Sequence, residues 1–290
     1  MAQFQSLADL ANLTQDELLP GLVNTLINQD QFSGVLFANA QLTDRPAVKG
    51  NRIVSEGTAS YVGCDDTITP VALSASAFSY DLETIATSFD ACIKGSSLFS
   101  SFTDVVSAEL GAALSRIGKK VASDAISGSG SGGEIAGIET QIVNTVGQAT
   151  AGAGNFSLSD LDAVMDLVRT SGPKVFVGAA ATVNTIMAEL RAANGATMTE
   201  VQGVGRAAVG FEGIPFLKSQ YASAGELHLI DLNEFQLWVG TSEDNNIGGV
   251  FNMIQVGALE NLLRKRFHIY TNVATVLKNT RAAASLTGVA

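Results

Sequence analysis

The stretch 97–133, SLFSSFTDVVSAELGAALSRIGKKVASDAISGSGSGG, holds the longest helical pattern in the chain and an abrupt end to it. Apolar residues recur at spacings of three and four, which predicts one long amphipathic helix over 97–126. Asp104 and Glu109 lie toward its start and its Arg and Lys residues toward its end, an order that complements the helix dipole. The Ser/Gly run 127–133 ends the helix and predicts a flexible joint.

The residues before this helix predict an arm and a long hairpin. Residues 1–41 hold two short amphipathic pieces that cannot stand alone, because isolated helices of that length are marginal in water. Turn residues in 42–76 separate short β-like runs, which indicates a two-stranded hairpin with too few apolar residues to bury a face. Such a hairpin needs another surface to pack on. Alternating polar and apolar residues then predict one strand over 77–86.

After the joint, the patterns indicate a compact mixture of helices and strands. A helix is predicted at 159–169, with Ser159 as its N-cap, followed by a strand at 174–178. Thr182 is the expected N-cap of a third helix, which ends before Gly195. Further strands are predicted at 214–217, 227–232, 235–239, 250–256 and 266–277. The fold class is therefore α+β, with one dominant helix and no internal repeat.

The chain has few charged residues for its length. Charged residues make up 16% of the 290 residues, where a soluble domain has about 25%, and apolar residues make up 46%. A soluble monomer must cover its surface with polar groups, so this shortage indicates that much of the surface faces other subunits. A monomer coated with Ser and Thr is the alternative. The length suits one large domain or two closely joined ones.

The charge and the cysteines bear on partners and compartment. The formal net charge of −11 weighs against a protein that coats a nucleic-acid duplex, because phosphate binding needs clustered Lys and Arg. No apolar run reaches the ~18 residues of a membrane span, and the N-terminus lacks a signal-peptide pattern. Cys64 and Cys92 are interpreted as free thiols in a reducing cytosol.

One glycine motif matches a dinucleotide-binding loop. Residues 203–208, GVGRAA, have its spacing, with Ala in the last place. The binding mechanism requires a helix N-terminus after the motif, but Gly210, Gly213 and Pro215 follow and break any helix. A mobile glycine loop is the preferred interpretation, and an enzyme that binds a nucleotide there is the alternative.

Residue types that carry metal or acid–base chemistry are scattered. His228 and His268 each stand alone in a β-like segment, far from the two cysteines, so no metal cluster is recognisable. Neighbouring carboxylates lie in polar loops, where solvated turns are the simpler interpretation. No catalytic, cofactor-binding or metal-binding residue is therefore predicted, and the chain is not expected to be an enzyme.

The sharpest basic cluster is Arg264-Lys265-Arg266. A nucleic-acid site would need more basic residues and stacking aromatic rings; Phe267 and Tyr270 are close, so this hypothesis stays open. Inter-subunit salt bridges or a solvated strand edge are the preferred interpretation.

The elements follow one another in a distinctive order: an arm, a hairpin, a strand, a long helix, a glycine joint, an α+β block and long returning strands. This order resembles the Hong Kong 97 fold of tailed-bacteriophage major capsid proteins. Residues 211–216, FEGIPF, resemble that family's Gly-x-Pro turn into a strand. Residues 159–162, followed by 175–177, resemble the helix and strand before its Asn-Thr helix, here at 184–185. Residues 260–278 resemble its closing strand. The resemblance covers nearly the whole chain.

The resemblance implies a division of labour along the chain. Its parts would be an N-terminal arm at 1–41, an extended loop at 42–76, a peripheral domain with the spine helix at 77–135, an axial domain at 136–248, and returning strands at 249–290 that complete both domains. The arm and the loop would lie over a neighbouring subunit. Residues 1–76 are thus expected to be mostly intermolecular, and the core of each subunit is expected to begin near Phe78.

The function implied by the resemblance is assembly. Pentamers and hexamers would build the icosahedral head around the double-stranded DNA of a tailed phage, through many weak interfaces summed by symmetry. An encapsulin-like shell around cargo enzymes is the alternative. Expected contacts between subunits lie at Arg45, Lys49, Arg52, Glu56, Arg264, Lys265 and Arg266.

The implied partners are other copies of the chain, a portal, a cement protein and packaged DNA held by non-specific contact, without a membrane or a cofactor. A separate scaffolding protein is expected, because the chain has no room for a scaffolding segment of its own. The expected location is the virion, and the host cytoplasm during assembly. Some members form Lys–Asn cross-links; Lys49 lies in the loop, but no Asn partner can be assigned and cross-linking stays open.

Overall fold

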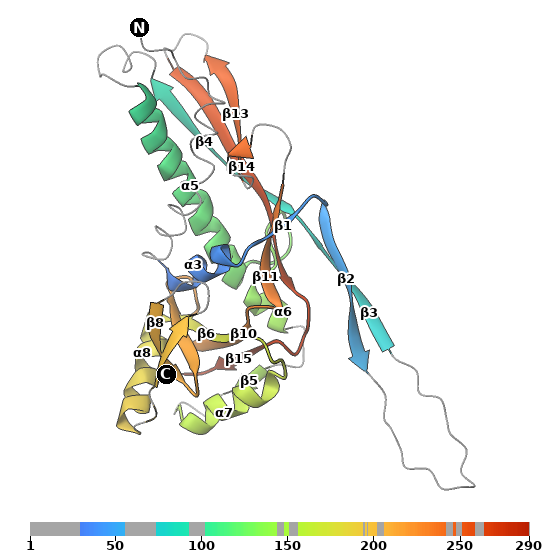
Figure 1. Cartoon of the computed structure of the whole chain (residues 1–290), viewed down its shortest axis with the longest axis vertical. Helices are drawn as coiled ribbons and strands as arrows, with labels where there is room; N and C mark the ends of the chain where they lie inside the picture. The colour runs from blue at the N-terminus through green and yellow to red at the C-terminus, as the bar shows by residue number, and fades with distance from the viewer. Residues whose placement is uncertain are drawn as a thin grey trace, which may run out of the picture.

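The long helix runs beside a long sheet in an elongated molecule (Figure 1). The computed structural model describes residues 30–55, 74–92, 102–143, 148–150, 156–193, 195, 197–201, 206–241, 246–247, 251–258 and 264–289. Its helices are α3 (Gln31–Ala38), α5 (Phe102–Ser127), α6 (Ile138–Val143), α7 (Leu158–Leu167) and α8 (Ala180–Ala192). Its strands are β1 (Gln41–Thr43), β2 (Ala47–Ser55), β3 (Ser74–Asp81), β4 (Glu83–Cys92), β5 (Gln148–Thr150), β6 (Lys174–Ala179), β7 (Thr197–Val201), β8 (Arg206–Phe211), β9 (Ile214–Ser219), β10 (Glu226–Asp231), β11 (Phe235–Gly240), β12 (Asn246–Ile247), β13 (Phe251–Ala258), β14 (Arg264–Leu277) and β15 (Ala283–Thr287).

Helix α5 confirms the predicted helical pattern from Phe102 onward, whereas 97–101 lie outside the described residues. From Leu110 onward its predicted apolar stripe is buried, and α5 packs on β4 and β14. The buried members of that stripe are Leu110, Ala113, Leu114, Ile117, Val121 and Ala125. None of the helices in the described ranges has the length and apolarity to cross a membrane.

The flexible joint predicted after α5 is instead a hydrogen-bonded turn. The amide of Gly128 donates to the carbonyl of Asp124 at 2.8 Å, and the amide of Gly137 donates to the carbonyl of Gly128 at 2.9 Å. Ser129 and Ala136 form a β-bridge across the turn. A Cβ on Gly128 would collide with the carbonyl oxygen of Asp124, so the glycine permits close packing here. Gly128 thus meets a packing requirement.

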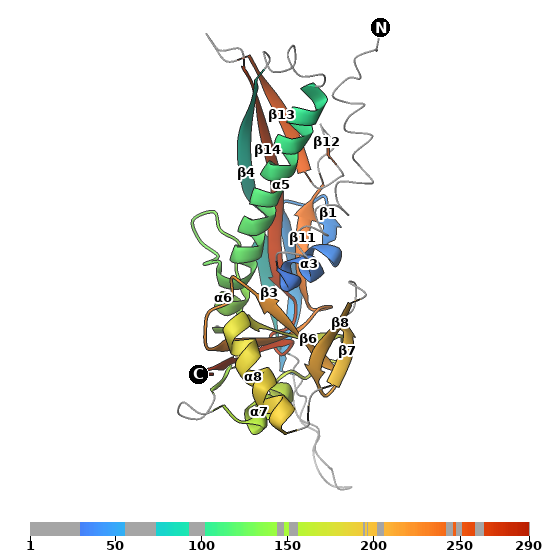
Figure 2. The same cartoon turned by 90° about the vertical axis from the view of Figure 1, so that its left-hand side faces the viewer.

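Strand β14 is the centre of a six-stranded sheet. One of its edges pairs with β4 from Arg264 to Val273, and the other pairs with β13 and then with β11. Strand β12 extends the sheet beyond β13, and β1 adds to β11 in parallel orientation. Helix α5 covers this sheet (Figure 2). The strands predicted at 235–239, 250–256 and 266–277 are therefore confirmed as one sheet.

A second, seven-stranded sheet lies at the other end of the molecule, in the order β5-β15-β10-β6-β9-β8-β7. Helices α7 and α8 pack against it (Figures 1 and 2). Because successive strand side chains point to opposite faces, Phe176 joins the cluster under α7 and α8, while Val175 and Val177 join the cluster that contains α5. The cluster that contains α5 also includes residues of the six-stranded sheet, so one core crosses the expected domain boundary at 135/136.

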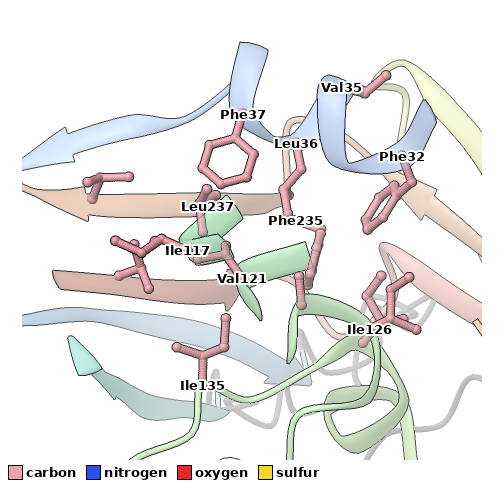
Figure 3. Close-up of a cluster of buried hydrophobic side chains, with 14 of the residues drawn as sticks. Phe32, Val35, Leu36, Phe37, Ile117, Val121, Ile126, Ile135, Phe235 and Leu237 are labelled. Carbon is pink, nitrogen blue, oxygen red and sulfur yellow. The ribbon is translucent and has the colours of Figure 1, made fainter. Parts of the chain in front are cut away.

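Helix α3 corrects the expected beginning of the core. Phe32 and Leu36 are fully buried, and Figure 3 shows them with Phe37 against Phe235 of β11 and residues of α5. The buried side chain of Asp30 caps α3 by accepting from the amide of Ser33, and it also accepts from the amide of Gln220 after β9. The eight-residue helix is too short to be stable alone and depends on this packing. The expectation that the core begins near Phe78, with 1–41 as an arm, is therefore wrong for residues 30–41.

The hairpin is longer than predicted. Strands β2 and β3 pair antiparallel from Ala47 with Asp81 to Ser55 with Ser74, so the hairpin passes the expected limit at 76. The strand predicted over 77–86 is split at Leu82, whose amide bonds to the carbonyl of Pro46 at 3.0 Å. The chain changes partners there, because β3 pairs with β2 and β4 pairs with β14. A period-two pattern continues through such a change and cannot reveal it.

Two predicted helix caps are also wrong. Helix α7 begins one residue earlier than predicted, and Ser157, not Ser159, is its N-cap, with its amide donating to the Asp160 side chain at 2.8 Å. Strand β6 runs directly into α8, so Ala179 holds the N-cap position. Thr182 is buried in the first turn of α8, where its hydroxyl accepts from the amide of Gly225 at 2.9 Å.

The burial of α3 predicts a large stability difference between two apolar sites. Phe32→Ala should lower the free energy of unfolding by about 3–5 kcal/mol, because it leaves a cavity in the core. Leu42→Ala is the control, since 56% of Leu42 is exposed. Urea denaturation of both variants measures the difference, and equal losses would contradict the packing described for α3.

Candidate functional site

The β2–β3 hairpin extends away from the rest of the molecule (Figure 1). Side-chain burial is described for residues 47–52 and 75–81 of this hairpin, and every one of those residues is half-buried or exposed. An isolated two-stranded hairpin is marginal in water and needs a surface to pack on. The chain therefore builds an extended element without giving it a core of its own.

Arg52 ties the hairpin to the body of the molecule. Its Nη2 donates to the hydroxyl of Tyr80 at 2.7 Å, and to the carbonyl oxygen of Leu277 at the end of β14 at 2.5 Å. Its guanidinium carbon lies 4.6 Å from the centroid of the Phe78 ring, a cation–π distance. The Arg52 side chain thus contacts two residues of β3 and binds the hairpin to β14.

The ring beneath Arg52 lies over a glycine. Gly50 is the cross-strand partner of Phe78, and a Cβ at Gly50 would lie 2.5 Å from the ring carbon Cζ. Because Gly50 has no side chain, the Phe78 ring can lie over β2. The ring also shields a glycine that would otherwise weaken the strand. The rings of Phe78 and Tyr80 are 5.8 Å apart, so the platform for Arg52 continues along β3.

Leu277, the anchor of Arg52, is itself held by α6. The buried Gln141 accepts from the amide of Leu277 at 2.9 Å and donates to the carbonyl of Thr275 at 3.1 Å. It also donates to the carbonyl of Ala136 at 2.6 Å, in the turn after α5. The end of β14 therefore fixes the hairpin on one side and α6 on the other. Gln141 could not be identified from the sequence, because a single amide side chain in a short helix belongs to no motif or periodic pattern.

The expected basic cluster lies at the opposite end of β14. Arg266 forms a bidentate pair with Asp90 of β4, with Nε–Oδ1 and Nη2–Oδ2 distances of 2.7 and 2.9 Å, and this partner raises the pKa of Arg266. Lys265 is partly exposed, and the backbone of Arg264 pairs with that of Cys92. Arg266 and the hairpin anchor Leu277 are 11 residues apart along β14 (277 − 266), roughly 36 Å in an extended strand.

The expected subunit contacts are thus divided between two places. Arg45 and Lys49 are exposed near or on the hairpin, whereas Arg52 contacts its own chain. Glu56 lies outside the described residues, as do Cys64 and residues 203–205 of the glycine motif. A contact role for the charged side chains stays a prediction. The last three residues of the glycine motif, 206–208, begin strand β8, where dinucleotide binding would require a helix.

A cluster that sequence reasoning missed surrounds His228. Its Nε2 lies 3.8 Å from a carboxylate oxygen of Glu139 on α6 and 3.8 Å from one of Glu226 on β10. The Ser223 hydroxyl donates to Glu139 at 3.0 Å. The nearby His228 ring, followed by the Ser223 hydroxyl, lowers the pKa of Glu139, against the opposing effect of burial. Glu226 and His228 share one face of β10, but Glu139 comes from a distant part of the chain, so no local spacing could have indicated the whole cluster.

Comparisons with known proteins give the fold. No protein-family model matches the sequence, and no curated protein sequence matches it. The capsid of cyanophage A-1(L) is similar with a TM-score of 0.68 and 14% identity, over 90% of this chain and 92% of that one. The SrpI encapsulin of Synechococcus elongatus gives 0.67 and 13%, over 86% and 84%. The capsid of a native GTA particle gives 0.63 and 15%, over 89% and 91%. The expected Hong Kong 97-type fold is therefore confirmed.

The anchor at Leu277 leads to a prediction for Gln141. Gln141→Leu keeps the size of the side chain but leaves the buried amide of Leu277 and the carbonyl of Thr275 without their partner. The free energy of unfolding should fall by about 1–3 kcal/mol, measured by urea denaturation. Gln255→Leu, on the exposed part of β13, is the control and should change it little. Equal effects at the two sites would contradict the role of Gln141.

The contacts of Arg52 lead to a second prediction. Arg52→Met keeps the aliphatic stem but removes the donors to Tyr80 and Leu277. Backbone amides of β2 and β3 should then exchange hydrogen severalfold faster, while those of α5 are unchanged, because a hairpin without its tether opens more often. Mass spectrometry of the exchanged peptides measures this. Arg116→Met, an exposed site on α5, is the control. Unchanged exchange in the hairpin would show that Arg52 does not hold it.

Proposed function

We propose that the chain is the structural subunit of a closed protein shell, and in particular of the icosahedral head of a tailed phage. The observation that carries the proposal is the tethered hairpin, whose described side chains find no core within the chain. A neighbouring copy can supply the missing surface. The similarity of fold to phage capsids over nine-tenths of the chain supports the same conclusion.

The mechanism is the summation of many weak interfaces. In a closed shell each copy repeats the same contacts, so a modest gain at each contact becomes a stable assembly. The hairpin supplies reach, and Arg52 limits the directions in which it can point. Large exposed apolar side chains offer further contact sites, at Leu42, Met198, Ile254 and Val256. Such a subunit has a structural role and needs no catalytic group.

The proposed shell is built from pentamers and hexamers and encloses double-stranded DNA. With a formal net charge of −11, the chain would touch packed DNA only weakly and without sequence preference. A scaffolding protein, a portal and a cement protein are the proposed partners, in the host cytoplasm during assembly and then in the virion. In this proposal the extended loop runs to Asp81, and residues 30–41 belong to the body of the subunit.

Electron microscopy tests the shell. The full chain, purified alone or with a co-expressed scaffolding protein, should form closed particles in negative stain. A chain that stays monomeric under all assembly conditions would refute the proposal. The content of the particles then separates the two kinds of shell. The similarity to the SrpI encapsulin makes packaged protein the second candidate, and packaged nucleic acid supports the phage head.

A charge reversal on the hairpin tests its contact with a neighbour. Lys49→Glu changes an exposed side chain, so the free energy of unfolding of the subunit should not change, but the yield of particles should fall severalfold. The yield is measured by sedimentation and micrographs. Lys119→Glu, exposed on α5, is the matched control for net charge. If both variants assemble like the parent protein, Lys49 lies outside every subunit interface.

A further inference from the structure

The cluster around His228 has the composition of a metal site. Three side chains each direct one donor atom toward a common point, and these atoms lie within 4.8 Å of one another. They are one imidazole nitrogen and two carboxylate oxygens, from His228, Glu139 and Glu226. Glu139 lies on α6, and the other two lie on β10. The cluster therefore spans two elements that meet only in the folded chain.

His228 is buried without a hydrogen bond. Only 1% of it is exposed, and neither ring nitrogen has a hydrogen-bond partner among the described residues. Strand alternation explains its orientation, because Leu227 and Leu229 join the core under α7 and α8, while Ile230 joins the other core. His228 shares the face of Ile230 and points toward α6. A buried polar ring without a partner is costly and calls for an explanation.

An ion pair by itself does not provide that explanation. The Nε2 atom is equally far, 3.8 Å, from the two carboxylate oxygens, and both distances exceed the range of a hydrogen bond, about 2.7–3.2 Å. A single N–H can donate well to only one of them. Three donors around a shared point are instead the arrangement that a cation requires.

We propose that Glu139, Glu226 and His228 bind a divalent transition-metal ion, with Zn²⁺ as the representative of the class. Imidazole nitrogen and carboxylate oxygen are Zn²⁺ ligands, at about 2.0–2.2 Å. Ligands at that radius in a tetrahedral site lie roughly 3.3–3.5 Å apart, so the glutamate oxygens would move inward from 3.8 Å of the imidazole and from within 4.8 Å of each other. The glutamate side chains are 24% and 33% exposed, which leaves both the freedom to move and a route for the ion from solvent.

The charges agree with this assignment. Two glutamate side chains face the site, and a divalent cation would balance their negative charge. The bound ion would join α6 to β10, close to the point where Gln141 joins α6 to β14. Its effect is to stabilise the subunit, and the inference does not depend on shell assembly.

Metal binding to the full-length protein tests the proposal. The protein, without a polyhistidine tag, is freed of metal with a chelator, dialysed and titrated with Zn²⁺ by calorimetry, and bound metal is counted by mass spectrometry. One Zn²⁺ per chain is expected, with a rise in the melting temperature on loading. Glu139→Gln and Glu226→Gln should each weaken binding about tenfold or more, since each removes a ligand. Glu189→Gln, exposed on α8, is the matched control.

His228→Gln tests the buried ligand and should abolish binding; should this variant fail to fold, the two glutamate variants decide the question. Excess Mg²⁺ should not displace Zn²⁺, because Mg²⁺ prefers oxygen ligands. Absence of Zn²⁺ binding, binding that Glu139→Gln and Glu226→Gln leave unchanged, or displacement by Mg²⁺ would each overturn the site. Micrographs of particles remain the separate measure of the proposed shell.

Discussion

The pairing of β14 along both of its edges is the constraint on which the rest of the structure depends. This 14-residue strand holds β4 on one side, and β13 followed by β11 on the other. Backbone groups in a ladder must find partners, so the length of β14 sets the length of the sheet that α5 covers. Its last residue, Leu277, carries the backbone groups that Arg52 and Gln141 bind.

The β2–β3 hairpin also depends on β14, although it extends away from the six-stranded sheet. A two-stranded element without buried side chains would have no defined direction if the loops at its base were free. Arg52 removes part of that freedom by joining β3 to the strand with the most partners. The polar bond is worth little compared with a core, but Arg52 is paired with Ser76, well out along the described hairpin, and it holds that part of the hairpin to the body of the molecule. Reach and direction are therefore supplied by different parts of the sequence.

Much of the framework could be predicted from local patterns. The stripe of α5 from Leu110 to Ala125 is periodic over several turns, and β14 coincides with the long β-like stretch 266–277. Helix α3 could not be predicted in the same way, since eight residues give too short a pattern and the helix depends on packing against β9, β11 and α5. The break between β3 and β4 at Leu82 could not be predicted either, because a change of strand partner leaves the alternation of polar and apolar residues intact.

The sequence by itself determined the α+β class, the dominant helix, the presence of a hairpin without a core, and the order of elements that resembles a phage capsid. These features follow from periodicity and composition, which depend on neighbours along the chain. Only the tertiary structure decided that Gln141 holds Leu277, that Arg52 anchors the hairpin, and that Glu139 and Glu226 meet at His228. Such contacts join residues far apart in the chain, and their energy depends on distances that only the folded backbone sets.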